Sequence, residues 1–230
     1  MIKAEFPAET PRGVRIINTV RLVVGGDEED DPGHLITVFE DVTDRRSAEA
    51  QVVHMALHDA LTDLPNRRRF TEQLDRMSGR GRQGDLIAVL FLDLDGFKDV
   101  NDRFGHDVGN DLLVAVAARL RSCVRPGDIV ARMGGDEFTV MLTRLESVAP
   151  AVEVAERVAD VLTEELTVGP HKIRISTSIG IAVAPAPGAD PGDLLRRADA
   201  AMYRAKAQGK AGWAMDPSSL EPSGNGNADA

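Results

Sequence analysis

Residues 131 to 142 read ARMGGDEFTVML, with two glycines and two acids set between apolar stretches. A Gly-Gly pair in this setting predicts a tight β-hairpin, because glycine adopts the positive φ angles that a two-residue turn requires. The glycines do not explain Asp136 and Glu137, since a carboxylate near a sheet core costs free energy unless a positive charge meets it. The stretch therefore predicts a hairpin whose two acids need a separate explanation.

A second acidic cluster lies upstream in FLDLDGFKDVND, residues 91 to 102. Asp93 and Asp95 end a predicted buried strand, and Lys98 follows. Acids at the end of a central strand and on a neighbouring hairpin could share magnesium and leave room for a triphosphate. For either cluster alone, a solvated cap is an equally good interpretation; the two together favour a metal site. An EF-hand is excluded, because its loop would need Gly at position 98, which is Lys, and Glu at 104, which is Phe.

The chain around these clusters alternates between helical and strand patterns, which predicts an α/β fold with at least one antiparallel hairpin in its sheet. The predicted helices span 67–78, 108–122, 149–166 and 190–208, and the predicted strands span 85–92, 128–133, 137–142, 171–184 and 212–215.

The N-terminal part has a different pattern. Residues 14–24 and 34–42 are rich in β-branched side chains and predict two antiparallel strands, too few for a domain. From Thr43 an apolar stripe at helical spacing predicts a connecting helix, which either pairs with a second copy or lies on its own domain. Residues 216–230 lack apolar periodicity, which predicts disorder.

Composition limits the classes of function. With 230 residues and 43% hydrophobic content, the chain can form one full domain plus a fragment. The net charge of -10 disfavours general affinity for nucleic acid. The apolar stretch Leu86–Leu92 is far below the roughly 20 residues of a membrane helix, so we expect a cytoplasmic chain, with an anchor upstream still possible. The single Cys123 cannot form an internal disulfide.

Five segments, in order, resemble the GGDEF domain of diguanylate cyclases: DALTDLPNRRRF (59–70), FLDLDGFKDVNDRFGHDVGNDLL (91–113), RPGDIVARMGGDEF (125–138), STSIGIA (176–182) and ADAAMYRAKAQGK (198–210). The family joins two GTP molecules into cyclic di-GMP and releases two pyrophosphates. The resemblance implies a nucleotide-cyclase (palm-like) fold with a mostly antiparallel five-stranded sheet over residues 59–215. Residues 1–43 resemble the end of a PAS-like sensor domain, and 44–58 its connecting helix.

The resemblance also assigns roles to individual residues. It implies that Asp93 and Asp136, with the Leu94 carbonyl, hold two Mg²⁺ ions, for which Mn²⁺ could substitute. Asp136 would also accept the proton of the attacking 3′-hydroxyl, and Glu137 would support that site. The implied GTP-binding residues are Phe97, Lys98, Asn101, His106, Asn110, Lys206 and Lys210. Without the resemblance, His106 is an ordinary turn residue, and Lys206 and Lys210 are cations that favour a helix C-terminus.

A product-binding site and a partner are implied as well. Arg125 and Asp128, in RPGD, match the family's RxxD inhibitory site for cyclic di-GMP, and Arg157 resembles a secondary contact. Arginine suits this role, because it can bond guanine O6 and N7 in a bidentate manner. The resemblance also implies that catalysis needs a homodimer, because each subunit holds one GTP.

One residue departs from the family pattern. Position 110 is usually Asp and is Asn here, so one of the two contacts to guanine N1-H and N2-H₂ must weaken or rearrange. Two functions therefore stay open: an active, product-inhibited cyclase, or a GTP- or cyclic di-GMP-binding regulatory module of a larger protein that also carries an EAL-type phosphodiesterase.

Overall fold

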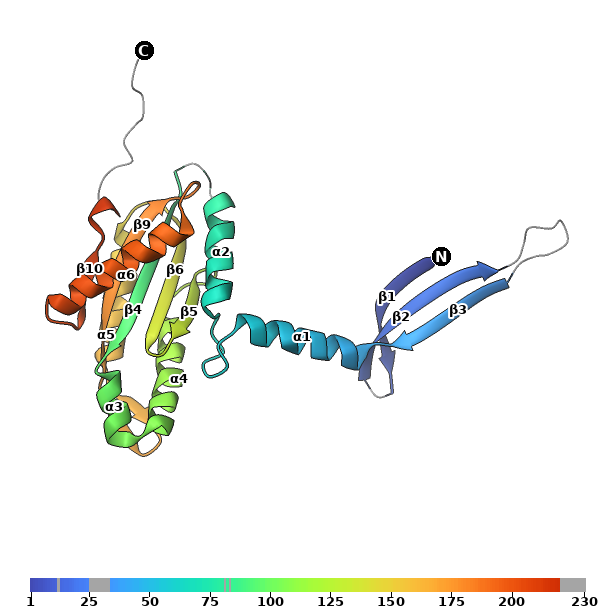
Figure 1. Cartoon of the computed structure of the whole chain (residues 1–230), viewed down its shortest axis with the longest axis horizontal. Coiled ribbons are helices and arrows are strands. Elements are labelled where there is room, and N and C mark those ends of the chain that lie inside the picture. Colours follow the sequence, from blue (N-terminus) through green and yellow to red (C-terminus); the bar gives the residue numbers. More distant parts are fainter. Residues whose placement is uncertain (12, 25–33, 81, 83, 220–230) are drawn as a thin grey trace, which may run out of the picture. The chain divides into compact units, whose positions relative to one another are not determined.

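The computed structural model describes residues 1–11, 13–24, 34–80, 82 and 84–219 (Figure 1). The chain forms two compact units, Met1–Ala56 and Leu57–Ala230.

The first unit is a three-stranded antiparallel sheet followed by a helix. Strands β1 (Ile2–Thr10), β2 (Gly13–Val24) and β3 (His34–Asp41) lie in the order β1-β2-β3, and α1 spans Thr43–Leu57. The sequence predicted β2, β3 and α1 but not β1. Pro7 lies within β1, and proline cannot donate a hydrogen bond to a neighbouring strand, so it normally argues against a strand. Because β1 lies at the edge of the sheet, the proline is tolerated there.

The second unit has the α/β fold that the sequence predicted. Its five-stranded sheet is mixed: three strand pairings are antiparallel, and the β9-β10 pairing is parallel. In the order β10-β9-β4-β6-β5, the strands span Gly212–Met215, Ser176–Pro185, Leu86–Asp95, Glu137–Leu145 and Ile129–Gly134. The helices are α2 (Arg67–Arg80), α3 (Phe97–Phe104), α4 (His106–Ser122), α5 (Ala149–Thr163) and α6 (Pro191–Ala207).

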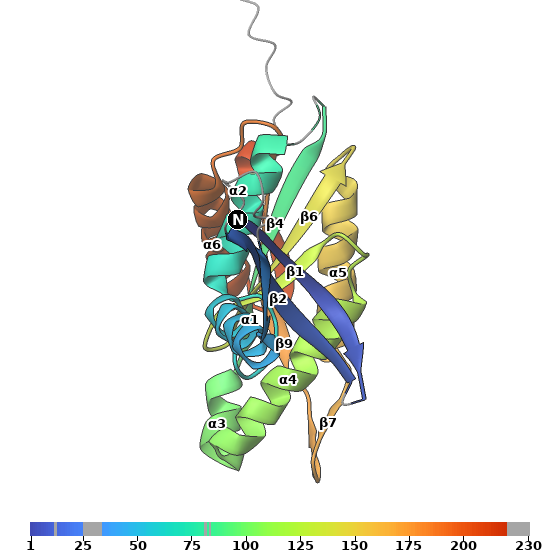
Figure 2. The same ribbon diagram turned by 90° about the vertical axis from the view of Figure 1, so that its right-hand side faces the viewer.

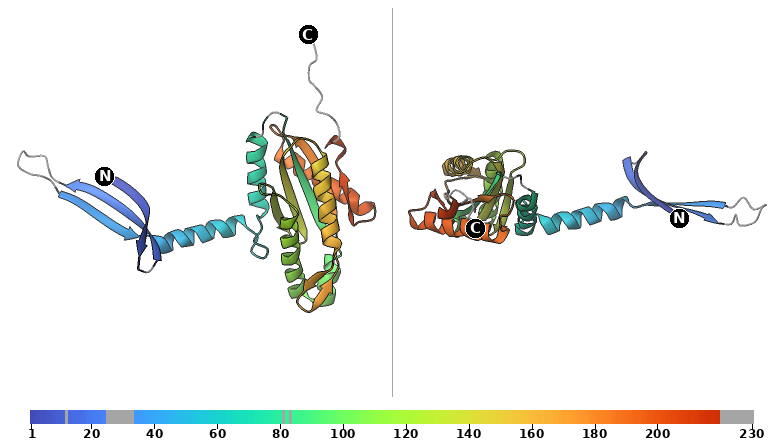
Figure 3. Two further views of the ribbon diagram at one scale, coloured as in Figure 1. Left: turned by 180° about the vertical axis from the view of Figure 1, so that it is seen from behind. Right: turned by 90° about the horizontal axis from the view of Figure 1, so that it is seen from above.

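Helices cover both faces of this sheet. On one face α2 and α6 pack against alternate residues of β4, among them Ile87, Val89 and Phe91. On the other face α4 and α5 pack against the alternate set of β4 residues, Ala88, Leu90 and Leu92. The two layers are visible from the side in Figure 2, and α4 and α5 cross the near face of the sheet when the molecule is seen from behind (Figure 3). Burial on both faces explains why β4 is an almost continuous apolar run.

A glycine in β9 brings α6 unusually close to the sheet. A Cβ atom at Gly180 would overlap the carbonyl oxygen of Ala198 and the backbone nitrogen of Met202. These are backbone atoms of α6, so the helix can lie at this distance only because position 180 has no side chain.

Several predicted boundaries are wrong. The strand predicted over 171–184 is two strands, β8 (His171–Ile173) and β9, and β8 pairs with a short β7 (Leu166–Val168) where the helix from 149 was expected to continue. The short helix α3 was not predicted, because the sequence pattern there was dominated by the acidic motif.

The predicted disorder from residue 216 is wrong for residues 216–219. Asp216 accepts a hydrogen bond from Arg197 Nε at 2.8 Å, and Ser219 Oγ accepts one from the Val183 backbone nitrogen at 2.8 Å. Both Asp216 and Ser219 are buried, so this segment packs against β9 and α6. The rest of that prediction, 220–230, falls outside the described residues.

Candidate active site

The two acidic clusters of the sequence meet at one end of the sheet. Asp93, near the end of β4, is the register partner of Glu137, the first residue of β6. The Leu94 backbone nitrogen donates a hydrogen bond to the Asp136 carbonyl oxygen at 3.3 Å. The adjacency that the sequence predicted is thus confirmed, while the roles of Asp93, Leu94, Asp136 and Glu137 stay predictions.

Lys206 provides the positive charge nearest to these acids. Its Nζ lies 2.7 Å from Asp93 Oδ2. Burial raises the pKa of Asp93; the Lys206 ammonium opposes this shift, and the neighbouring Asp136 and Asp95 reinforce it. Burial would lower the pKa of Lys206, but the hydrogen bond to Asp93 and the negative charges of Asp93 and Asp136 together raise it.

Glu137 experiences the same excess of negative charge. Burial raises its pKa, Arg67 opposes the shift, and Asp199, Asp93 and Asp136 add to it. The end of the sheet therefore concentrates carboxylates with only a few cations nearby. Such a site favours a bound cation.

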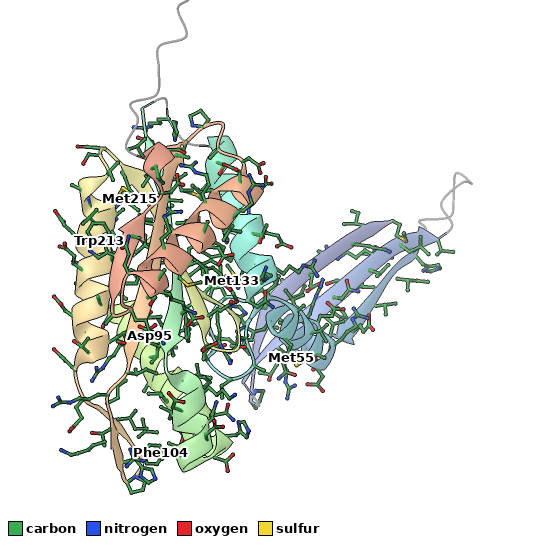
Figure 4. All side chains as sticks on the ribbon, turned by 60° about the vertical axis from the view of Figure 1, so that its left-hand side comes forward. Met55, Asp95, Phe104, Met133, Trp213 and Met215 are labelled. Atoms are coloured by element: carbon green, nitrogen blue, oxygen red, sulfur yellow. The ribbon has the colours of Figure 1, made fainter. Side chains whose placement is uncertain are left out.

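Asp95 differs from Asp93 although only one residue separates them. Its carboxylate accepts hydrogen bonds from Ser176 Oγ at 2.9 Å, Ser178 Oγ at 2.8 Å and the Ala211 backbone nitrogen at 3.1 Å. Figure 4 labels Asp95 within this end of the sheet. Because protein donors occupy Asp95, Asp93 is the carboxylate of β4 that is better placed to bind a ligand.

The donor atoms at this site suit magnesium. The candidate ligands are all oxygens, from the Asp93 and Asp136 carboxylates and the Leu94 carbonyl, and Mg²⁺ prefers oxygen ligands. In the described part of the chain, no group of three or more His, Cys, Asp or Glu side chains could hold a metal ion by itself. Mg²⁺ usually binds one or two carboxylates and completes its shell with water and substrate phosphates.

The predicted base-binding residues gather on the hairpin of α3 and α4. Asn101 lies on α3, and its side chain is packed against Gly109 of α4. His106 and Asn110 are exposed and lie four residues apart on α4, so they share one face of that helix. Phe97 packs partly against the core and Lys98 is exposed, both in the first turn of α3.

The remaining predicted cation, Lys210, lies in the turn after α6. It is exposed and has a φ of 64°. The next residue, Ala211, bonds to Asp95, which ties this turn to the end of β4. The structure therefore brings Lys206 into the acidic cluster itself and Lys210 to its border.

The predicted product-binding residues also lie together. Asp128 is almost fully buried, with 3% of its side chain exposed, and accepts a hydrogen bond from the Thr143 nitrogen at 3.3 Å. Its Oδ2 lies 3.5 Å from Arg125 Nε, and Arg125 also donates to the Thr143 carbonyl at 2.6 Å. Arg157 donates two bonds to the Cys123 carbonyl, just before this turn. Arg125 remains 58% exposed, so its guanidinium is the accessible group, whereas Asp128 holds the turn.

The sequence did not predict one link to the β5–β6 hairpin. Arg132 donates to the Asp59 carboxylate at 2.9 and 3.1 Å and to the Gly135 carbonyl at 3.0 and 2.7 Å. It therefore connects the turn before α2 to the residue that precedes Asp136. The sequence signal for this link is a charged residue inside an apolar hairpin strand, because a buried arginine needs an acidic or carbonyl partner. The Arg132 side chain is only 11% exposed.

The described helices include none that is both long and apolar enough to cross a membrane.

Comparison with known proteins identifies the domain. The family model described as "Diguanylate cyclase, GGDEF domain" matches residues 56–212. The chain is 43% identical over 174 residues to the bifunctional diguanylate cyclase/cyclic di-GMP phosphodiesterase MucR of Pseudomonas aeruginosa, covering 75% of this chain and 25% of MucR. It is 41% identical over 163 residues to the diguanylate cyclase TpbB of the same species, covering 70% of this chain and 38% of TpbB.

Solved structures agree. The GGDEF domain of TpbB superposes with a TM-score of 0.65 at 40% identity, covering 69% of this chain and 94% of that one. The structure of the coiled coil and GGDEF domain of DgcB from Caulobacter crescentus, in complex with c-di-GMP, superposes with a TM-score of 0.68 at 30% identity. The match covers 76% of this chain and 93% of that one. The chain thus spans well under half the length of the two curated relatives. With the family model matching most of its length, the chain belongs to the GGDEF-domain family of diguanylate cyclases.

Proposed function

We propose that the chain is a diguanylate cyclase that condenses two GTP into cyclic di-GMP and releases two pyrophosphates. The observation that carries the proposal is the meeting of Asp93 with Asp136 and Glu137 on adjacent strands, with Lys206 at 2.7 Å from Asp93. The residue types suit phosphoryl transfer, in which the protein mainly positions the reactants and neutralises charge.

In this proposal Asp93, Asp136 and the Leu94 carbonyl hold the magnesium, or manganese in its place. The metal would stabilise charge on the attacking and leaving oxygens of the displacement. Asp136 accepts the proton of the 3′-hydroxyl, and Glu137, whose pKa is raised mainly by burial, supports the same site. Lys206, with Lys98 and Lys210, neutralises the triphosphate and the departing pyrophosphate.

Base recognition falls to the α3–α4 hairpin. Asn101 and Asn110 would contact guanine, with His106 and Phe97 beside them. The exposure of His106 and Asn110 on one helix face leaves them accessible to a nucleotide.

Assembly and regulation complete the proposal. Each subunit would hold one GTP, so two subunits must face each other for each 3′-hydroxyl to reach the other α-phosphorus. Val52, Val53 and Met55 of α1 are each more than half exposed and suit pairing with a second copy. Arg125, with Arg157 nearby, would bind cyclic di-GMP as an inhibitor, and residues 1–43 would be the end of a PAS-like sensor.

The test is direct. The purified chain, incubated with GTP and Mg²⁺, should form cyclic di-GMP that chromatography resolves from GTP. Asp136→Asn should abolish product formation and keep the melting temperature, because it removes an anionic ligand without changing the shape of the hairpin. Asp75→Asn, an exposed change on α2, is the matched control. Product formation by Asp136→Asn at the control rate would refute the assigned role of Asp136.

A regulatory role is the second candidate. Asn110 stands where the family usually has Asp, and one relative, MucR, is bifunctional. A regulatory module would bind GTP or cyclic di-GMP in calorimetry but form no product. Turnover of GTP by the isolated chain would exclude it.

A further inference from the structure

Gly109 stands where neither helix stability nor backbone geometry calls for glycine. It lies in the first half of α4 and is buried. Its φ is not in the left-handed region, unlike that of Gly105 at +88°. Alanine would stabilise a helix at such a position. A glycine here therefore points to a close approach of another group.

That group is the side chain of Asn101. A Cβ atom at position 109 would overlap Asn101 Oδ1 and stand 3.0 Å from Asn101 Cγ. The next nearest atom is Phe97 Cζ at 3.4 Å, which is near ordinary van der Waals contact. The carboxamide of Asn101 thus occupies the space that a side chain at 109 would take. By contrast, a Cβ at Gly79, on α2, would meet nothing within 4 Å.

This contact places Asn101, which we assign to the base, against the residue that precedes Asn110 in α4. Asn101 is seated against the α4 backbone at the position immediately before Asn110. A carboxamide that is packed in this way loses rotamer freedom before the ligand arrives, which lowers the entropy cost of a directional hydrogen bond.

We propose that Gly109 is a positioning residue for purine recognition: the missing side chain lets Asn101 seat its carboxamide beside Asn110, where both can bond one base edge. The inference rests on the proposed function, because it takes guanine as the base. It adds a residue that touches no substrate and acts only through Asn101.

The test measures binding of 3′-deoxy-GTP to the whole chain by calorimetry, since this analogue lacks the attacking hydroxyl and cannot turn over. Gly109→Ala should weaken binding roughly fivefold to tenfold, the loss expected for about one hydrogen bond. The preference for 3′-deoxy-GTP over 3′-deoxy-ATP should narrow by a similar factor. Gly79→Ala is the matched control and should change neither quantity.

A double-mutant cycle separates positioning from a general packing effect. Asn101→Ala removes the atoms that a Cβ at 109 would overlap, so adding Gly109→Ala to Asn101→Ala should change affinity less than about twofold. If Gly109→Ala alone does not fold, the double variant should fold, because the obstacle has gone. A full effect of Gly109→Ala in the Asn101→Ala background, failure of the double variant to fold, or no effect of Gly109→Ala alone would each overturn the inference. Failure of the unchanged chain to bind 3′-deoxy-GTP would instead refute the proposed function.

Discussion

Replacing Arg132 with alanine should loosen the hairpin that presents Asp136. The guanidinium makes two bonds to the Asp59 carboxylate and two to the Gly135 carbonyl, at 2.7 to 3.1 Å. With side chains only 11% and 23% exposed, the Arg132–Asp59 pair is well shielded from water. Arg132→Ala therefore removes the hydrogen bonds through which the Arg132 side chain links the turn before α2 to the turn of the β5–β6 hairpin.

The size of the effect follows from what each partner keeps. A hydrogen bond to a charged group contributes about 1.5–3 kcal/mol, and several from one side chain are not additive. After Arg132→Ala, Asp59 still accepts from the Thr62 nitrogen at 2.9 Å and from Thr62 Oγ at 2.7 Å, so it is not left as an isolated buried charge. We expect a loss of about 2–3 kcal/mol, which lowers the melting temperature by about 5 to 10 °C for a unit of this size.

Activity should fall for a separate reason. Gly135 immediately precedes Asp136, so its carbonyl would be free to move once both donors are lost. Because small misplacements of reacting groups are costly, we expect kcat for cyclic di-GMP formation to fall about tenfold. The KM for GTP should change little, since the residues that we propose contact the base lie on α3 and α4.

The control is Arg68→Ala on α2. Arg68 pairs with Glu72 at 2.9 Å, but the side chains are 69% and 44% exposed, and exposed pairs contribute about 0–1 kcal/mol. Thermal melts and initial rates of both variants decide the matter. If Arg132→Ala matches Arg68→Ala in melting temperature and in kcat, the link does not support the hairpin.

Acid should weaken the same link. Burial would raise the pKa of Asp59, but hydrogen bonds from Thr62 and Arg132 outweigh burial and lower it. A carboxyl whose pKa is lowered by folding stabilises the folded state above its unfolded pKa of about 3.9, and this contribution disappears as the pH falls through the folded pKa. The difference in melting temperature between the unchanged chain and Asp59→Asn should therefore be full at neutral pH and shrink below about pH 4.

Three further predictions concern other parts of the domain. Arg125→Ala should lose affinity for cyclic di-GMP in calorimetry without losing turnover; unchanged affinity would mean that the exposed guanidinium does not bind product. Gly180→Ala should destabilise the domain by about 3 kcal/mol, because the new Cβ meets α6 backbone, whereas Gly79→Ala should not; equal melting temperatures would contradict the close packing of α6 on β9. Asn110→Asp should lower the KM for GTP about tenfold and widen the preference for GTP over ITP, because aspartate can accept from both N1-H and N2-H₂ of guanine; if neither changes, Asn110 does not contact the base.

The sequence predicted the parts of the fold that follow from local patterns. β4 is a long apolar run because both of its faces are buried, and the β5–β6 hairpin is marked by its two glycines. The elements it missed are short or locally ambiguous. α3 has eight residues, and β7 and β8 have three each, which is too few for a periodic pattern to appear.

Contacts between distant residues could not be predicted in the same way. Asp59 and Arg132 are separated by 73 positions, and neither local sequence indicates that the other residue is its partner. Their pairing depends on the position of the turn before α2. Backbone contacts hold that turn beside β5: Asn66 forms a β-bridge with Arg132, and the Pro65 carbonyl accepts a hydrogen bond from the Arg132 backbone nitrogen.

The choice between Asp93 and Asp95 shows how tertiary structure completes a motif. Both acids lie at the end of the same strand, and residues two apart on a strand point to the same face. The local sequence therefore cannot distinguish which of them binds a ligand. β9 distinguishes them: Ser176 and Ser178 both donate to Asp95, and Ala211 adds a third bond. Neutral donors thus satisfy the Asp95 carboxylate, whereas the Asp93 carboxylate pairs with the ammonium group of Lys206. A carboxylate paired with a lysine can exchange that cation for a metal, whereas one held by three fixed donors cannot do so without unpairing them.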